Sequence, residues 1–217
     1  MTKGLFITFE GTEGCGKSTQ VELLARQLGA LGHRVRVLRE PGGTPIGEEI
    51  RHTLKHSQQN HAMTAEAELL MMNASRAQLV REIIRPALAA GEIVVCDRFY
   101  DSTTAYQGHG RELDLVLVKS VIDFAVGGTR PDLTLLLQVP PHVSAERLRS
   151  RQSTLPFARD RIEEADEKFF ARVDEGYKTI GAETSRVRVV DGLGSIENVS
   201  VKIWEIVQPV LPKVGRW

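Results

Sequence analysis

Residues 11–18 of the chain are of the types that bind the phosphates of a nucleotide. Their sequence, GTEGCGKS, fits the phosphate-loop pattern G-x-x-x-x-G-K-[ST] at every fixed position. The glycines let backbone N–H groups approach phosphate oxygens, Lys17 adds a positive charge, and the Ser18 hydroxyl suits Mg²⁺. The pattern predicts an ATP-binding loop made of Gly11, Thr12, Glu13, Gly14, Cys15, Gly16, Lys17, Ser18 and Thr19.

The segments on either side of this loop decide whether the match is meaningful, because short glycine patterns also arise by chance. Residues 5–9 (LFITF) form an apolar run typical of a buried parallel strand. After the loop, Val21, Leu24 and Leu28 recur at helical spacing, so we expect a helix from about Lys17 to near Gly32. The N-terminus of that helix would offer free N–H groups and partial positive charge to the phosphates.

Strands alternate with helices along the rest of the chain. The pattern predicts an α/β fold with a five-stranded parallel sheet and helices on both faces. Further strands are expected at 34–38, 93–96, 133–139 and 187–190. Helices are expected near 46–54, from Thr64 onward with a kink near Pro86, and at 113–124 and 196–207, with a polar surface loop at 56–63. We expect one domain over residues 1–217.

The composition favours a soluble protein with no nucleic-acid or membrane partner. The 28 Lys and Arg residues balance 28 Asp and Glu residues, so no net field attracts either partner. No segment approaches the ~18 apolar residues of a membrane span, and the amino terminus has no signal-peptide profile. Cys15 and Cys96 indicate neither a disulfide framework nor a metal site, and we expect a cytoplasmic location.

Two charged residues follow the predicted third strand. Asp97 occupies the position from which the second acid of a phosphate-loop protein reaches Mg²⁺, so Ser18 and Asp97 are the predicted metal ligands. The planar guanidinium of Arg98 suits a phosphate, and a structural ion pair is the alternative interpretation.

Residues 146–161, ERLRSRQSTLPFARDR, contain five arginines and two acids. We predict a lid here, with a mobile loop near 152–156 between two helices. Its arginines would stabilise the charge on a transferred phosphoryl group while the lid excludes water. A solvated helix face is the alternative interpretation of such a run of charge.

Residues that suit a flat ligand occur in two further places. Met72 and Arg76 lie four residues apart on the predicted long helix and therefore share a face. An apolar side chain beside an arginine suits a carbonyl-bearing ring such as a pyrimidine, whereas Met72 alone would be typical of core packing. Tyr106 and Gln107 follow a Ser-Thr-Thr cluster in an expected polar loop at the same edge of the sheet.

Several motifs of the chain occur together in one family. FEGTEGCGKST, REPGGT, LLMMNASRAQ, CDRFYDSTTAYQGHGR, RPDLTLLL and DRIE stand in the family's order, and the chain resembles bacterial thymidylate kinases from Leu5 to about Tyr177. The resemblance implies transfer of the γ-phosphate of ATP to dTMP, giving dTDP, with Mg²⁺ as cofactor. It also implies a mobile lid and a homodimer.

The same resemblance implies the roles of individual residues. The implied dTMP contacts are Glu13 at the 3′-hydroxyl, Pro41 at the sugar, Arg51 and Arg98 at the phosphate, Met72 where the family usually stacks an aromatic ring, Arg76 at O4 of the base, Thr103 and Gln107 near its other edge, and Tyr106 at C2′. Gly14 stands where one branch of the family has a catalytic arginine. The predicted catalytic residues are therefore Lys17, Arg98 and the lid arginines Arg149, Arg151 and Arg159, and a lid longer than usual leaves open which of the three reaches the transferred group.

Two other functions fit parts of the pattern. A deoxynucleoside kinase would use a carboxylate such as Glu10 or Glu13 as a base, but Arg51 and Arg98 better suit a second phosphate. A nucleotide-dependent switch would bind phosphates without a product, but the N-K-x-D guanine reader is absent from the sequence and the lid arginines would serve no purpose there. We therefore expect a kinase that acts by positioning and charge neutralisation.

Overall fold

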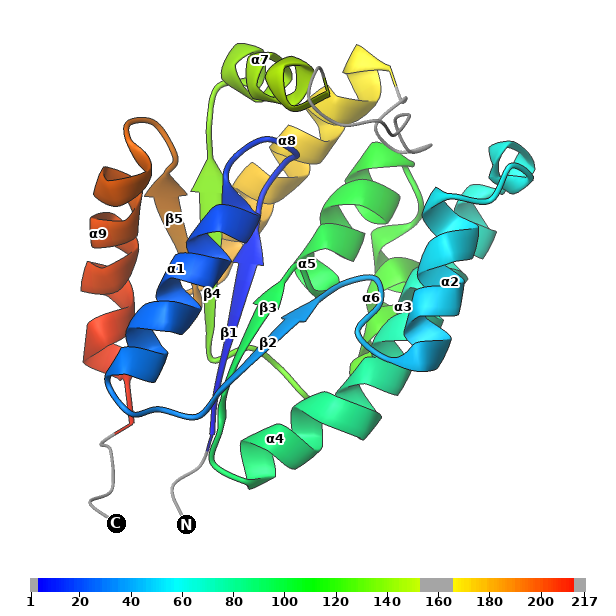
Figure 1. Ribbon diagram of the computed structural model, residues 1–217. Coiled ribbons are helices and arrows are strands. Elements are labelled where there is room, and N and C mark those ends of the chain that lie inside the picture. Colours follow the sequence, from blue (N-terminus) through cyan, green and yellow to red (C-terminus); the bar gives the residue numbers. More distant parts are fainter. Residues whose placement is uncertain (1–3, 153–165, 213–217) are drawn as a thin grey trace.

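A five-stranded parallel sheet runs through the computed structural model, which describes residues 4–152 and 166–212 (Figure 1). The strands are β1 (Leu5–Glu10), β2 (Val35–Arg39), β3 (Ile93–Asp97), β4 (Leu133–Gln138) and β5 (Val187–Asp191), in the spatial order β2-β3-β1-β4-β5. All neighbouring strands pair in parallel. The predicted fold class is confirmed, and every predicted strand boundary falls within one residue of the observed one.

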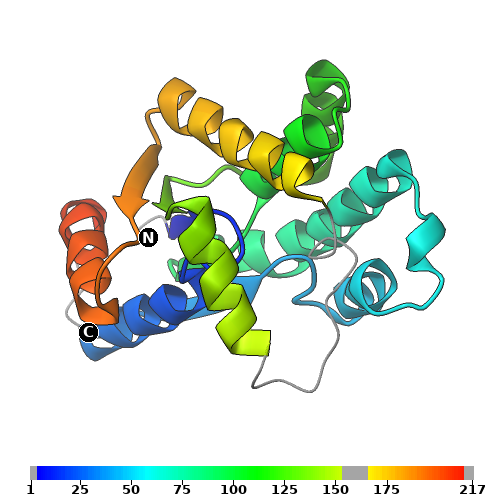
Figure 2. The same cartoon turned by 90° about the horizontal axis from the view of Figure 1, so that it is seen from above.

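Helices cover both faces of the sheet. On one face, α1 (Lys17–Ala30) and α9 (Ile196–Val207) share a hydrophobic core with Ile7 and Phe9 of β1. The opposite face is covered by α3 (Ala65–Leu79), α6 (Leu115–Val126) and α8 (Glu167–Glu183), as Figure 2 shows from above. Side chains alternate along a strand, so Phe6 contacts this second layer. A strand buried on both faces explains the unbroken apolar run at residues 5–9.

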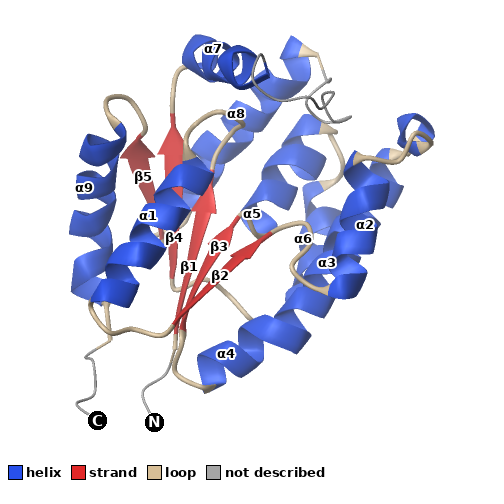
Figure 3. Cartoon of the chain, in the orientation of Figure 1, coloured by secondary structure: helices blue, strands red, loops and turns tan. Residues whose placement is uncertain are grey.

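The remaining helices are α2 (Pro45–Lys55), α4 (Arg85–Ala89), α5 (Tyr100–Thr103) and α7 (Pro141–Gln152), with 3-10 turns at Asn60–Ala62 and Gln208–Val210 and π-helical turns η2 (Val80–Ile84) and η3 (Thr104–Gly110). Of these, Figure 3 shows α7 above the upper edge of the sheet, α2 beside α3 and α4 at the lower end of the sheet. Thr64, the predicted start of the long helix, caps α3 by accepting a hydrogen bond from the Ala67 N–H. No helix in the described ranges has both the length and the apolar character to span a bilayer.

The structure corrects one sequence-based expectation. The predicted polar loop around Tyr106 and Gln107 is wrong, because these residues belong to η3, which continues directly from α5. Serine and threonine are indifferent helix formers, and burial of Tyr100, Ala105 and Tyr106 against the sheet and α8 outweighs that local preference.

Two further expectations concern the predicted long helix and the predicted lid. The predicted long helix is α3, which passes through η2 into α4, and Pro86 stands in the first turn of α4. Pro86 has no N–H to donate to the preceding turn, and that turn is the widened π-helical turn η2. Gln152, where the predicted loop at 152–156 begins, is the last residue of α7. The rest of that loop and the lid residue Arg159 lie in residues 153–165, outside the described part of the chain.

Candidate active site

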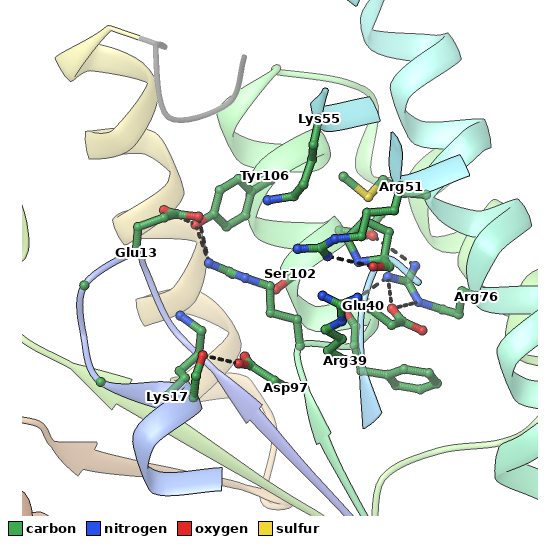
Figure 4. A pocket seen from close by; sticks show the side chains of 18 of the residues that line it. Glu13, Lys17, Arg39, Glu40, Arg51, Lys55, Arg76, Asp97, Ser102 and Tyr106 are labelled. Atoms are coloured by element: carbon green, nitrogen blue, oxygen red, sulfur yellow. Dashed lines mark hydrogen bonds and ion pairs between the residues drawn. The ribbon is translucent and has the colours of Figure 1, made fainter. Parts of the chain in front are cut away.

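A cavity of about 450 Å³ opens at the carboxyl ends of the strands (Figure 4). This edge is where open parallel sheets bind ligands. Most of the predicted site residues line the cavity together: Glu13, Gly14, Gly16, Lys17, Ser18, Thr19, Pro41, Arg51, Met72, Arg76, Asp97, Arg98, Thr103, Tyr106 and Gln107. Residues far apart in the sequence therefore form one site.

The phosphate loop leads from β1 into α1, which begins at Lys17 as predicted. Gly16 precedes the helix with a φ of 99° and no side chain caps the N-terminus, so backbone N–H groups there remain available to an anion. Lys17 Nζ donates to the carbonyls of Gly11 at 3.0 Å and Thr12 at 2.8 Å. Lys17 is therefore folded back over the loop that the pattern assigns to phosphate.

The two predicted metal ligands lie side by side. The Ser18 hydroxyl donates to Asp97 Oδ2 at 2.6 Å, between the first turn of α1 and the end of β3. Across the described residues no group of three or more His, Cys, Asp or Glu side chains could hold a metal ion. Two protein oxygens suit Mg²⁺, which commonly takes few protein ligands and fills its shell with phosphate oxygens and water.

Arg98 connects the phosphate loop to η3. Its Nη2 donates to Glu13 Oε1 at 2.7 Å and to the Tyr106 hydroxyl at 3.2 Å, and that hydroxyl donates to Glu13 Oε2 at 2.6 Å (Figure 4). Burial alone would raise the pKa of Glu13, but Arg98, Lys17 and Tyr106 outweigh burial and the pKa lies below its ordinary value. Glu13 is therefore an ionised acceptor held in one orientation.

A second layer of polar groups lies behind Arg98. Its Nη1 donates to Ser102 at 3.0 Å and to the Tyr177 hydroxyl of α8 at 3.1 Å. Both of those residues also bond Glu10 at the end of β1, Ser102 at 2.5 Å and Tyr177 at 3.1 Å. Burial, together with the charge of Asp101, raises the pKa of Glu10 to about 7. The orientation of Arg98 is thus set from β1, α5 and α8 at once.

The cavity is closed on the α3 side by Arg76, which is 2% exposed. Its Nε donates to Glu40 at 2.8 Å, its Nη1 to Asn73 and Thr103 at 2.9 Å each, and its Nη2 to the Phe99 carbonyl at 3.2 Å. The second Nη2 hydrogen faces Glu40, 2.6 Å away. All donors of Arg76 are therefore engaged by protein groups, which the sequence did not predict.

Comparison with known proteins shows the family of this chain. The chain matches the family model for thymidylate kinase over residues 9–203. The chain belongs to the thymidylate kinase family. It is 43% identical over 215 residues to a thymidylate kinase of Citrifermentans bemidjiense, covering 98% of this chain and 95% of that protein. The thymidylate kinase of Geobacter sulfurreducens is 45% identical over 215 residues, covering 97% and 99%.

A solved structure agrees with these relatives. The crystal structure of thymidylate kinase from Ehrlichia chaffeensis matches with a TM-score of 0.77 at 32% identity, covering 95% of this chain and 99% of that one. The thymidylate kinase family phosphorylates dTMP to dTDP using ATP. The resemblance inferred from the motifs is therefore confirmed.

The predicted lid arginines are distributed unevenly in this thymidylate kinase family member. Arg149 on α7 is exposed and donates to the carbonyl of Ala145 in its own helix. Arg147 instead lines the cavity, with its guanidinium 3.5 Å from the Gly14 carbonyl and 3.2 Å from the Gly192 carbonyl. The backbone of Arg151 lies in the last turn of α7, and Arg159 is outside the described residues. Among the α7 arginines whose side chains the structure describes, Arg147 contacts the phosphate loop, and it was not one of the three predicted lid arginines.

Sequence reasoning missed several other cavity residues: Arg39, Glu40, Lys55, Ser102, Arg147 and Leu148. Arg39 ends β2 at the ligand-binding edge of the sheet, and Lys55 lies one helical turn after Arg51 on α2, so position alone could have identified both. Figure 4 shows Arg51 and Lys55 directed from α2 toward the cavity, across from Lys17. The cavity is therefore cationic at both ends, which suits two phosphate-bearing ligands.

Proposed function

We propose that this protein transfers the γ-phosphate of ATP to dTMP. The observation that carries the proposal is that one cavity combines the phosphate loop with a second set of cations outside the loop, Arg51 and Arg98. A kinase acting on a phosphorylated acceptor must hold two sets of phosphates close together against their mutual repulsion. Arg98 belongs to both halves, since it bonds Glu13 of the loop and Tyr106 of η3.

The ATP phosphates are proposed to bind along Gly11–Thr19. Lys17 would exchange its bonds to the Gly11 and Thr12 carbonyls for phosphate oxygens, because an ionic contact is stronger than a bond to a neutral carbonyl. Ser18 and Asp97 would hold Mg²⁺, which supplies charge neutralisation at the phosphates when bound.

For dTMP, Arg51 and Arg98 are proposed to bind the phosphate, Glu13 and Pro41 to lie near the sugar, and Tyr106 to pack against C2′. Met72 would lie against the base, with Thr103 and Gln107 at its edge. Arg76 can donate to the base only by releasing one present partner, whereas Thr103 accepts from Arg76 and keeps its own hydroxyl hydrogen to donate. We therefore propose that Thr103 and Arg76 act together on a carbonyl of the base.

A substrate panel tests the proposal. The protein is incubated with ATP, Mg²⁺ and, separately, dTMP, dUMP, dCMP and thymidine, and the products are separated by chromatography. We expect dTDP as the main product. Efficient phosphorylation of thymidine would favour a deoxynucleoside kinase, and tight ATP binding without a phosphorylated product would favour a switch. Lys17→Ala serves as the inactive control, provided that it melts at the temperature of the parent.

We also propose a homodimer, formed through α3 and α6. Large apolar side chains project into solvent from both helices: Leu70 at 58% exposure, Leu117 at 54% and Phe124 at 83%. Leu117 and Phe124 are seven residues apart and share a helical face. Light scattering should give twice the monomer mass, and Phe124→Asp should give a monomer, whereas Val201→Asp on α9 should not. A monomeric parent would refute this assembly.

A further inference from the structure

Gln107 has an amide whose two ends have different environments. It lines the cavity from η3 and is 2% exposed. Its Nε2 donates to Glu68 Oε1 at 2.8 Å. Among the described residues, none donates a hydrogen bond to the Gln107 Oε1. The end of the side chain that remains for the cavity is therefore a hydrogen-bond acceptor.

Glu68 of α3 determines which way this amide faces. The two ends of an amide have nearly the same size, so the hydrogen-bond partner decides its orientation. Glu68 is 0% exposed, and Arg111 approaches its two oxygens with Nε at 3.3 Å and Nη2 at 3.1 Å. A carboxylate paired with a guanidinium offers only acceptors, so Gln107 can face it only with the NH₂ end. Arg111 is itself held over the Phe169 ring of α8, 4.5 Å from its centre.

We propose that Glu68 is a specificity-determining positioning residue, which fixes Gln107 so that it presents an acceptor to the nucleobase. This inference rests on the proposed function, in which the base of dTMP lies beside Gln107. Thymine carries a ring N–H between its two carbonyls and can donate to an acceptor. Cytosine has an unprotonated ring nitrogen at the same place, and two buried acceptors facing each other leave both without a hydrogen bond.

Arg76 does not select the base in the way that Glu68 and Gln107 do. All of its N–H groups are engaged by Glu40, Asn73, Thr103 and Phe99, so its contribution to base selection requires one of them to move. The pair of Glu68 and Gln107 needs no such change. Selection of the ring N–H therefore follows from a contact that exists before the substrate binds.

The variant Glu68→Gln tests the proposal. The neutral side chain at position 68 can offer its NH₂ group to Gln107, which lets the amide turn and present a donor to the cavity. We measure kcat/KM for dTMP and for dCMP with ATP in parent and variant. The ratio of the two values should fall by about tenfold or more. Arg111→Lys is the matched control, because it keeps a cation beside Glu68 and should leave the ratio within about twofold.

A second substitution distinguishes a change in the orientation of the Gln107 amide from a change in packing around position 68. In the double variant Glu68→Gln, Gln107→Glu, position 107 has an acceptor at both ends, so the ratio should return toward the parent value. An unchanged ratio in folded Glu68→Gln overturns the proposal, and so does a lowered ratio that the double variant fails to restore. If Glu68→Gln does not fold, Glu68→Asp, one methylene too short to reach Gln107, should show the same loss. A parent that does not phosphorylate dTMP would instead refute the proposed function.

Discussion

At Arg98 the backbone is left-handed, with a φ of 70°, and this turns the chain out of β3 so that the guanidinium enters the cavity. Such a conformation costs a residue other than glycine roughly 1 kcal/mol. The Arg98 N–H bonds the Phe9 carbonyl at 2.9 Å, and four side-chain hydrogen bonds add to it. The contacts of Arg98 therefore stabilise its left-handed backbone and also connect the phosphate loop to η3.

Arg98→Lys should lower kcat/KM for dTMP by roughly 10- to 150-fold, because a single ammonium cannot reproduce the guanidinium fork. KM for ATP should change much less. Steady-state kinetics with each substrate varied in turn measures both. Arg36→Lys, at an exposed pair with Glu92, is the control and should behave as the parent. Equal losses for both substrates would show that Arg98 acts through the fold rather than on dTMP.

Tyr106 combines a ring that contacts the site with a hydroxyl that bridges Glu13 and Arg98. Tyr106→Ala should reduce the preference for dTMP over its ribonucleotide counterpart, which we expect to be roughly 5- to 150-fold in the parent. Tyr106→Phe keeps the ring and should keep the preference while lowering activity. The ratio of kcat/KM values for the two sugars distinguishes these effects. A preference that survives Tyr106→Ala would remove Tyr106 from the sugar site.

Most cavity residues were predictable because the phosphate loop and family motifs mark their positions. The hydrogen bonds between these residues were not predictable from the sequence. Glu10 and Tyr177 are 167 positions apart, and Ser102 and Tyr177 are 75 apart, so no local pattern connects them. Only the folded sheet brings these side chains together behind Arg98.

At the level of elements, η3 shows why a polar stretch can be helical. Gly110 and Gly176 let η3 and α8 approach closely, since a Cβ at Gly110 would lie 2.6 Å from Phe169 and one at Gly176 would lie 2.8 Å from His109. This close packing compensates for weak local helix preference. A single sequence shows the glycines but not what faces them.

Gly110→Ala should therefore destabilise the protein by about 1–3 kcal/mol through overpacking against Phe169 and Val173. Urea unfolding measures the change. Gly29→Ala is the control, because a Cβ at that helical position would meet no atom within 4 Å outside the backbone of its own helix, and it should be neutral or stabilising. A neutral Gly110→Ala would mean that α8 can shift at no cost.

The arginines of the predicted lid differ in the effects that we expect from their substitution. Gly14 lies under α7, where a Cβ would approach the Ser144 carbonyl at 2.8 Å, so the loop itself has no room for an arginine. We expect Arg147→Ala to raise KM for ATP about tenfold, by loss of an arginine beside Gly14. One of Arg149, Arg151 and Arg159 should act mainly in the transition state, so that its alanine variant loses kcat by far more than about threefold. If all three keep kcat within that limit, the lid is not catalytic.

For the whole molecule, the strands were predictable and their order was not. The strands β1, β3 and β4 are buried along nearly their whole length and read as mainly apolar runs, whereas the partly exposed edge strands β2 and β5 combine apolar residues with arginine. These two patterns located all five strands to within one residue. Which strands become neighbours depends on crossover packing, and no residue of β1 indicates that β3 and β4 flank it. Strand order is thus a property of the assembled layers.

Stability should depend on pH through Glu10. Burial and Asp101 raise its pKa from 4.5 to about 7, so the folded protein binds this proton more tightly than the unfolded chain. The resulting stabilisation is complete when the pH is below the pKa of Glu10 in the unfolded chain, and it is lost as the pH rises through about 7. Its size is on the order of 3 kcal/mol. Relative to Glu10→Gln, the parent should lose unfolding free energy between about pH 5 and about pH 8. A constant difference across that range, measured by urea unfolding, would contradict this assignment.

The position of β1 in the middle of the sheet affects how the protein is made. Ile7 pairs with Val95 on one side and with Leu133 on the other, so β1 leaves the ribosome before either of its neighbours. At about 5–20 residues per second, the nascent chain exposes an unpaired apolar strand for several seconds or more. Its two open edges could pair with other chains during that interval. We therefore expect the yield of native protein to be limited by events during translation, before the catalytic edge of the sheet exists.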